Sequence, residues 1–371
     1  MSIVIFILVL VALIVVHEFG HFVAAKLSGM RVDEFGLGYP PRAFRFAKKG
    51  ETEYTLNWLP FGGFVKIYGE DGDEGQHPDS PRAFSAKPRI LQAITLAAGI
   101  LMNLVFAWVL LSITLGLGTP QALSLEEAAK APDAVLTIAD VLPGSPAAEA
   151  GLKPGDALKN AQFGDTSYSS YDPQGFTDFI AKDTETAPIT LTVLRPDTTG
   201  TKELTLTVSP RTGTITSDPT RPAIGVSVAP VGTLKLPWYK APVEGALLTW
   251  GVVQQVAIGL VSFFGGIFTF HADLSSVSGP IGIAGAVGNA SHQGISSLLS
   301  ITALISINLA LINLVPLPAL DGGRLLFVLI ETVTRRRIKP SIANAFNTAG
   351  FIFLVILMLV VTAHDVFKIF G

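Results

Sequence analysis

The sequence predicts a multi-pass α-helical membrane protein that also carries one soluble α+β domain. Of its 371 residues, 49% are hydrophobic and only 15% are charged, which is apolar for a water-soluble chain. Crossing a hydrocarbon core of about 30 Å takes about 20 apolar residues. Candidate stretches lie at roughly 2–25, 90–118, 245–270, 295–317 and 341–363, and only the first contains ionisable groups inside it.

The charge balance and the residue types present narrow the range of functions. A net charge of −3 and a pI near 6.1 imply no basic surface, so no nucleic-acid partner is expected. The chain has no cysteine, which excludes disulfides, thiol nucleophiles and thiolate ligands. Any metal ion must therefore be held by histidine, aspartate or glutamate side chains.

Residues 1–27 are expected to form a retained transmembrane helix, because Ile3–Val16 lacks the basic flank and cleavage site of a signal peptide. The helix carries His17-Glu18-Phe19-Gly20-His21, whose two histidines are one turn apart and share a face. This is the HExxH spacing of zinc enzymes, with Glu18 placed as general base. Ionisable groups inside a span are costly, so they indicate a functional site. The alternative places the pentapeptide at the water interface.

Residues 28–89 are expected to form a cytoplasmic, membrane-associated β-hairpin region, followed by a second transmembrane helix at 90–118. Residues 31–89 contain nine Lys and Arg residues, whereas 119–295 contain ten in about three times the length. The positive-inside rule then places 28–89 in the cytoplasm and the amino terminus outside. Strands are expected at 41–47, 53–58 and 64–68, with a break at Gly62–Gly63.

Residues 119–232 are expected to form the soluble domain, outside the cytoplasm. The stretch LTIADVLPGSPAAEAGLKPGDAL has the pattern of a strand, a short helix at 146–150 and a tight turn into the next strand. Three further strands are expected in PITLTVLRP, KELTLTVSP and AIGVSVAP.

The segment 233–294 decides how many helices span the membrane. If its helix at 245–270 spans, the chain crosses five times and the helix at 295–317 ends outside. If that helix lies along the outer surface, four helices span and 295–317 ends in the cytoplasm. Gln254–Gln255 and Gly265–Gly266 favour the surface position.

A third metal ligand is expected in the segment 318–340, which holds a cytoplasmic loop. Asp321 follows a Pro-x-Pro break and precedes two glycines, so the helix must unwind where the carboxylate lies. The alternative is that Asp321 only caps the helix that begins near Gly322. Asn313, about two turns earlier, is expected to hydrogen-bond a substrate or to bridge two helices.

The position of Asp321 in the sequence leads us to expect four membrane-spanning helices. It can meet His17 and His21 only if four helices span, because a fifth span would put it on the opposite side. We therefore expect 245–270 on the outer surface and the last transmembrane helix at 341–371.

These motifs together resemble the site-two protease family of intramembrane metalloproteases, in the bacterial branch that cleaves membrane-spanning anti-sigma factors. Besides the pentapeptide, the resemblance rests on FGGFVKIYGE at 61–70, GSPAAEAGLKPGD at 144–156, SGPIGI at 278–283 and NLVPLPALDGGR at 313–324. It covers most of the chain. It implies zinc bound by His17, His21 and Asp321, with Glu18 as general base and Asn313 engaged with the substrate.

The resemblance also implies that the hairpin at 61–70 dips into the membrane near the site, where Gly62, Gly63 and Phe64 contact the substrate. A physical reason supports this role, because a transmembrane helix has all its amides bonded internally and must be unwound before it can be cut. An edge strand can hold the unwound chain by β-addition. The alternative is an ordinary cytoplasmic hairpin without substrate contact.

Residues 120–230 resemble one PDZ domain, where relatives often carry two. The expected fold is therefore four transmembrane helices, a membrane-dipping β-hairpin region and one extracytoplasmic PDZ-like α+β domain. A peptide ligand of this domain is expected. The preceding segment EEAAKAPDAV lacks the glycine-rich turn that usually binds a free carboxylate, so capture of a C-terminus is not predicted.

The predicted function is intramembrane zinc proteolysis in the bacterial inner membrane. The expected substrates are single-pass membrane proteins, such as anti-sigma factors or remnant signal peptides, after a first extracytoplasmic cut. Membrane lipid is the other expected partner. A scaffold with a structural metal would need four protein ligands, and the sequence offers three. A transporter would be expected to show inverted repeats, and none is visible.

Overall fold

The computed structural model describes residues 2–70, 80–181, 188–197, 200–214, 220–269, 279–336 and 338–370. The chain divides into two compact units, and each is described by itself. The membrane unit comprises Met1–Ile113, Pro242–Ser291 and Leu298–Gly371. The sheet unit comprises Thr114–Ala241 and His292–Ser297.

Within the described residues, five helices are long and apolar enough to cross a membrane. They are α1 (Ser2–Leu27), α2 (Arg89–Leu117), α6 (Ala241–Phe268), α8 (Ile295–Leu314) and α10 (Pro340–Phe370). Each of the five apolar stretches of the sequence thus forms a helix. Apolar side chains remain exposed along them, such as Leu8, Ile258 and Phe351, which suits a lipid environment.

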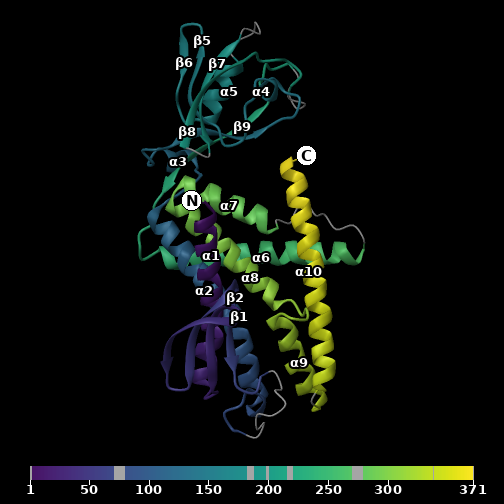
Figure 1. Cartoon of the computed structure of the whole chain (residues 1–371). Helices are drawn as coiled ribbons and strands as arrows, with labels where there is room; N and C mark the ends of the chain where they lie inside the picture. Colours follow the sequence, from purple (N-terminus) through teal and green to yellow (C-terminus); the bar gives the residue numbers. More distant parts are fainter. Residues whose placement is uncertain are drawn as a thin grey trace. The chain divides into compact units, whose positions relative to one another are not determined.

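Helix α6 takes a different course from the other long helices. In Figure 1 it runs across α2 and α10 rather than along them. Its first turn is fixed to α2, because the Trp108 indole N–H donates to the Pro242 carbonyl at 2.8 Å. Val252 and Val256 pack with α2 and α8 around the buried Ile307, and the outer face of α6 is exposed.

Besides the short 3-10 helix η1 (Phe84–Ala86), the described part of the membrane unit contains two shorter α-helices. One is α7 (Pro280–Gln293), and the other is α9 (Asp321–Thr334). The loop expected at 318–340 therefore contains a 14-residue helix. Gly322 and Gly323 allow this helix, because a Cβ on either would strike the carbonyls of Val315 and Leu317 where α9 folds back. The glycine pair has low helix propensity, which this packing overrides.

The SGPIGI motif lies where α7 begins, next to the last long helix. The backbone amides of Gly279 and Gly282 donate to the two carboxylate oxygens of Asp365 in α10, at 3.2 and 2.8 Å. Asp365 is buried. Its negative charge therefore stabilises the positive end of α7 and ties that end to α10. Ser278 lies outside the described residues.

The hairpin region forms a small antiparallel sheet from β1 (Val32–Lys49) and β2 (Thr52–Ile67). Each long strand bends into two segments, because residues 32–37 pair with 63–67 on one side and with 53–56 on the other. Residues 42–49 pair with 52–57. The segment order across the sheet is therefore 42–49, 52–57, 32–37 and 63–67. Strands at 41–47, 53–58 and 64–68 were expected, but the central segment 32–37 was not.

The sheet unit is built on strands in the order β3-β9-β4-β5-β7-β8, with β6 paired to β5. These strands are β3 (Thr119–Ala122), β4 (Val135–Val141), β5 (Ala157–Phe163), β6 (Thr166–Tyr168), β7 (Ile189–Asp197), β8 (Gly200–Val208) and β9 (Val226–Leu234). Three short helices accompany them, α3 (Leu125–Ala128), α4 (Pro146–Glu149) and α5 (Pro173–Ala181). The three strand segments and the short helix expected from the sequence are present.

The GLKPGD turn of this unit is held by a buried ion pair. Asp156 is 0% exposed, and both its oxygens accept from Arg195 at 2.7 Å. Asp156 also accepts from the Lys153 amide at 2.9 Å, which closes the turn. The motif therefore serves the local fold of the sheet unit.

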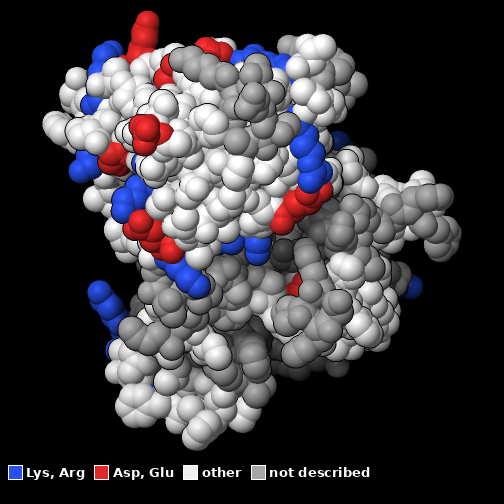
Figure 2. Space-filling view, turned by 90° about the horizontal axis from the view of Figure 1, so that it is seen from above, with Lys and Arg blue, Asp and Glu red and all other residues white. Residues whose placement is uncertain are grey.

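Charged side chains of the two signs are interspersed on the face shown in Figure 2. Exposed pairs of the sheet unit such as Lys159–Glu203, at 2.8 Å, illustrate the mixture.

Candidate metal centre

His17 and His21 lie on one face of α1, and each is 8% exposed. Their Nε2 atoms are 3.2 Å apart. Oδ2 of Asp321, the first residue of α9, lies 3.0 Å from His17 Nε2 and 3.3 Å from His21 Nε2. Of the described residues, these three form the one cluster of three or more potential metal ligands. The structure thus brings Asp321 to two histidines that precede it by 304 and 300 positions in the sequence.

The spacing of these three atoms fits a tetrahedral zinc site. Ligands bound at about 2.0–2.1 Å to a tetrahedral ion lie about 3.3 Å from one another. The observed separations of 3.0, 3.2 and 3.3 Å are close to that value. Oδ2 of Asp321 is also buried without a hydrogen-bond partner among the described residues. A buried oxygen without a partner is destabilising unless a cation binds there.

The electrostatics of Asp321 suit a cation ligand. Burial opposes ionisation of the carboxyl group, but the imidazoles of His17 and His21 outweigh it and hold the pKa of Asp321 below its ordinary value. The position at the first turn of α9 also favours a negative charge. Asp321 is therefore an anion at neutral pH.

Helix α2 supplies the groups that hold the two imidazoles. Nδ1 of His21 donates to the Thr95 carbonyl at 2.8 Å, which leaves its Nε2 lone pair free to bind a metal. Nδ1 of His17 lies 3.1 Å from Nδ2 of Asn103. Sequence reasoning missed both residues. The signal was a line of polar or small residues in an apolar helix, Gln92, Thr95, Gly99 and Asn103, which recur at helical spacing.

Glu18 lies beside the small sheet and near the metal cluster. The backbone amide of Val65 hydrogen-bonds its carboxylate. A Cβ on Gly63 would lie 3.3 Å from Cγ of Glu18 and 2.8 Å from Cγ2 of Ile14. The edge segment 63–67 therefore runs directly beside the turn of α1 that carries Glu18.

The other substrate-binding candidates named from the sequence are Gly62, Phe64 and Asn313. Gly62 is next to Gly63 and adopts φ +96°, which favours glycine. The Phe64 ring packs on Gly36 within the sheet. Asn313 lies half-buried in the last turn of α8, and the described residues give it no hydrogen bond to the three clustered side chains.

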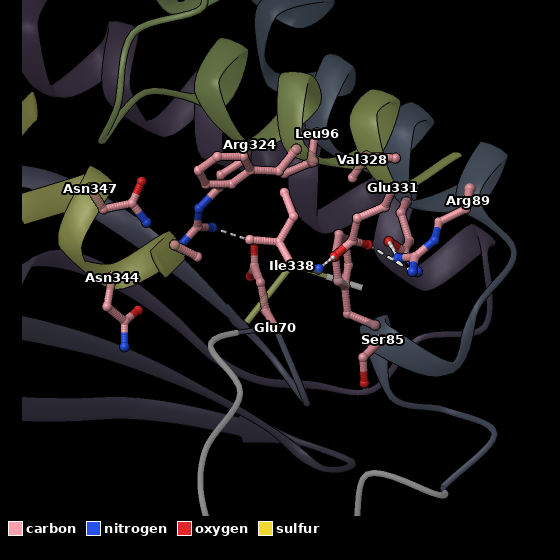
Figure 3. Close-up of a pocket in the computed structure, with 14 residues that line it drawn as sticks. Glu70, Ser85, Arg89, Leu96, Arg324, Val328, Glu331, Ile338, Asn344 and Asn347 are labelled. Carbon is pink, nitrogen blue, oxygen red and sulfur yellow. Dashed lines mark hydrogen bonds and ion pairs between the residues drawn. The ribbon is translucent and has the colours of Figure 1, made fainter. Parts of the chain in front are cut away.

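A cavity of about 230 Å³ is lined by Arg324 and other residues of α9 (Figure 3). Arg324 is three residues after Asp321 in the same helix. Two ion pairs cross the cavity: Arg324 of α9 with Glu70, and Arg89 of α2 with Glu331 of α9 at 2.7 Å. These pairs tie α9 to α2 and to the end of β2. They therefore help to hold Asp321 against the two histidines.

Comparison with known proteins supports the chemistry of this cluster. The sequence model of peptidase family M50 matches residues 5–357. A protein of Nostoc sp., named a putative zinc metalloprotease, is 35% identical over 363 residues, covering 95% of this chain and 93% of its own length. One of Clostridium perfringens with the same description is 35% identical over 356 residues, covering 96% and 95%.

A third relative is the zinc metalloprotease RasP of Oceanobacillus iheyensis. It is 28% identical over 448 residues, covering 100% of this chain and 99% of its own length. The family match spans both the pentapeptide of α1 and Asp321. The chain therefore belongs to peptidase family M50, the site-two protease family, and is a zinc metalloprotease of the cell membrane.

Proposed function

We propose that the chain cuts single-pass membrane proteins, such as anti-sigma factors or remnant signal peptides, after a first extracytoplasmic cut. Zinc is held by His17, His21 and Asp321. The observation that carries the proposal is the convergence of these three donor atoms, within 3.3 Å of one another, from apolar helices. Three protein ligands leave one coordination position open, which is the arrangement of catalytic rather than structural zinc sites.

Glu18 moves the proton in this reaction. Bound zinc supplies Lewis acidity, which polarises the scissile carbonyl and lowers the pKa of a water molecule. Glu18 accepts the proton of the attacking water and returns it to the leaving amine. Its contact with the Val65 amide holds the carboxylate beside the edge segment 63–67. Asn313 binds the substrate backbone. Among the described residues, its side-chain amide makes no hydrogen bond to the three clustered side chains.

The edge segment 63–67 holds the substrate in an extended form. Its inner side pairs with residues 32–37, and no other described strand pairs with its outer side. A substrate strand added there would run past Glu18, because Gly63 packs against that turn of α1. Gly62, Gly63 and Phe64 thus belong to the substrate-binding surface.

Four helices span the membrane, and α6 lies along its outer surface. The support is the direction of α8, whose Ser306 and Ala303 pack against Asn103 and Ala107, so that it runs antiparallel to α2. If both helices span, the chain between them crosses an even number of times. Among the described residues of that interval, only α6 is long enough to span, so we infer that it does not span. The crosswise course of α6 agrees with this arrangement (Figure 1).

The orientation follows from the distribution of basic residues. The β1–β2 sheet is cytoplasmic, and the amino terminus and the sheet unit are extracytoplasmic. The sheet unit is a PDZ-like domain that binds a peptide segment or limits which substrates reach the site. Its seven-strand sheet, with the short helices α4 and α5, supports this assignment.

Metal removal tests the proposed function. Purified protein is reconstituted in liposomes with a single-pass reporter whose outer part has been removed. Treatment with a zinc chelator is expected to stop cleavage, and added zinc to restore it. His17→Ala and Asp321→Ala are each expected to lose bound zinc and at least about 99% of activity, since ligand loss removes the Lewis acid. His364→Ala, outside the cluster, is the matched control. Cleavage that survives either ligand variant would contradict the proposal.

A methyl group at Gly63 tests the substrate-binding edge. The Cβ in Gly63→Ala would lie 2.8 Å from Ile14 Cγ2 and 3.2 Å from the Gly36 carbonyl, so the edge strand must shift away from α1. We expect kcat/KM to fall about 10- to 100-fold, because small displacements of a positioned substrate have effects of that size. Zinc content should not change. Gly251→Ala, where a Cβ meets open space, is the control. Unchanged kcat/KM would argue against the edge strand.

A further inference from the structure

Two buried polar atoms beside the metal cluster have no hydrogen-bond partner among the described residues. They are Oδ1 of Asn103 and Oδ2 of Asp321. Both belong to residues that contact His17, but on opposite sides of its ring. Asp321 Oδ2 is 3.0 Å from Nε2, and the Asn103 amide is 3.1 Å from Nδ1 through its Nδ2. Both contacts bear on which nitrogen of the His17 ring carries the proton.

In the structure, the contact with Asn103 determines the tautomer of His17. A neutral imidazole donates through one nitrogen and accepts through the other. With Nδ2 of Asn103 facing it, Nδ1 of His17 must accept, and the ring proton lies on Nε2, where it blocks metal binding. His21 has the opposite arrangement, because its Nδ1 donates to the Thr95 carbonyl at 2.8 Å.

We propose that Asn103 is a positioning residue that sets the metal-binding tautomer of His17. Its amide turns by about 180° within the same volume, so that Oδ1 accepts the Nδ1–H of His17. Nε2 of His17 then presents a lone pair to the cation, as His21 already does. The turned amide gives Asn103 Oδ1 its donor, and the cation gives Asp321 Oδ2 its partner. The NH2 group then takes the position that Oδ1 occupies now.

Neighbouring residues of α2 and α8 hold the Asn103 amide within hydrogen-bonding distance of the His17 ring. Asn103 is 0% exposed and lies one turn of α2 after Gly99, on the face that meets α1. The Ser306 hydroxyl of α8 donates to the Asn103 carbonyl at 2.8 Å, which ties this turn to a second helix. Removing an outer-shell partner of a metal-binding histidine typically lowers metal affinity about 10- to 100-fold. The inference rests on the proposed zinc site.

Two variants of Asn103 separate the proposed role from simple packing. Asn103→Leu keeps the approximate volume and removes the hydrogen bond. Asn103→Asp provides only acceptors, so it can bind His17 only when Nδ1 carries the proton. Ser306→Ala is the matched control, because it disturbs the same contact between α2 and α8 without changing the amide. Zinc affinity is measured on purified protein by competition with a chelator, and the His17 tautomer by ¹⁵N NMR of the zinc-loaded protein.

We expect Asn103→Leu to bind zinc about 10- to 100-fold more weakly, and Asn103→Asp and Ser306→Ala to stay within about threefold of the wild type. The His17 spectrum of the wild type should show a proton on Nδ1. Wild-type affinity in Asn103→Leu, or equal losses in the leucine and aspartate variants, would overturn the inference. If the wild type instead binds zinc independently of His17, the proposed site itself fails, which His17→Ala reveals separately.

Discussion

Replacing Glu18 with glutamine is expected to abolish peptide cleavage while the protein keeps its zinc. Glutamine has the shape of glutamate and can still contact the Val65 amide, but it cannot accept the proton of water. Glu18 is also outside the cluster of three ligand atoms, so its loss should leave the metal in place. General acid–base groups contribute about 10²- to 10⁴-fold to a rate, and Glu18 has two transfers to perform. We expect kcat to fall by at least about 10³-fold.

The measurement combines reporter cleavage in liposomes with zinc content per chain. Glu244→Gln, in the first turn of α6, is the matched control because it removes one carboxylate far from the pentapeptide in the sequence. Near-normal cleavage by Glu18→Gln would remove Glu18 from the mechanism. Loss of zinc together with activity would show that Glu18 holds the site together, and its role as the base would have to be abandoned.

The three residues of the cluster could be singled out from sequence because each part of the pattern is fixed locally. The spacing of His17 and His21 places both rings on one face of any helix, whatever surrounds it. Pro316, Pro318 and the glycine pair force the chain to break around Asp321. Only their meeting depends on the tertiary fold, and the number of spans was inferred from that meeting rather than the reverse.

The groups of α2 that contact the imidazoles of His17 and His21 could not be predicted in the same way. Thr95 contributes a backbone carbonyl, so its side chain carries no sign of the role. Asn103 faces His17 only because of how α1 and α2 pack, which depends on many side chains at once. The central strand 32–37 was missed for a related reason. It is paired on both sides and irregular at most positions, so a simple alternation of polar and apolar residues is lost.

The position of α6 relative to the membrane could be predicted only in part from its local sequence. Its length and hydropathy fit a spanning helix as well as α8 does. Local sequence therefore cannot distinguish a helix that crosses the membrane from one that lies along it. The direction of α8 relative to α2 supports the proposed position along the surface, because it limits how often the intervening chain can cross.

Replacing Gly99 with alanine is expected to eliminate zinc binding, although it adds only a methyl group. The new Cβ would strike Nε2 of His21 and lie 2.8 Å from both Cδ2 and Cε1 of the same ring. The ring cannot retreat freely, because its Nδ1 is bonded to the Thr95 carbonyl one turn away on the same helix. To make room, the His21 ring must either break its hydrogen bond to the Thr95 carbonyl or move away from His17 and Asp321. The first movement loses the orientation of one of the three ligands, and the second loses that ligand itself.

We expect Gly99→Ala to bind zinc at least about 100-fold more weakly and to lose cleavage in proportion. The fold should survive, because alanine in a helix is favoured over glycine by about 1 kcal/mol. Gly116→Ala is the matched control, since it makes the same change in α2 where a Cβ meets nothing within 4 Å. Full zinc affinity in Gly99→Ala would mean that α1 and α2 can separate without disturbing the metal. The histidines would then be positioned by α1 and α9 alone, and α2 would have no part in building the site.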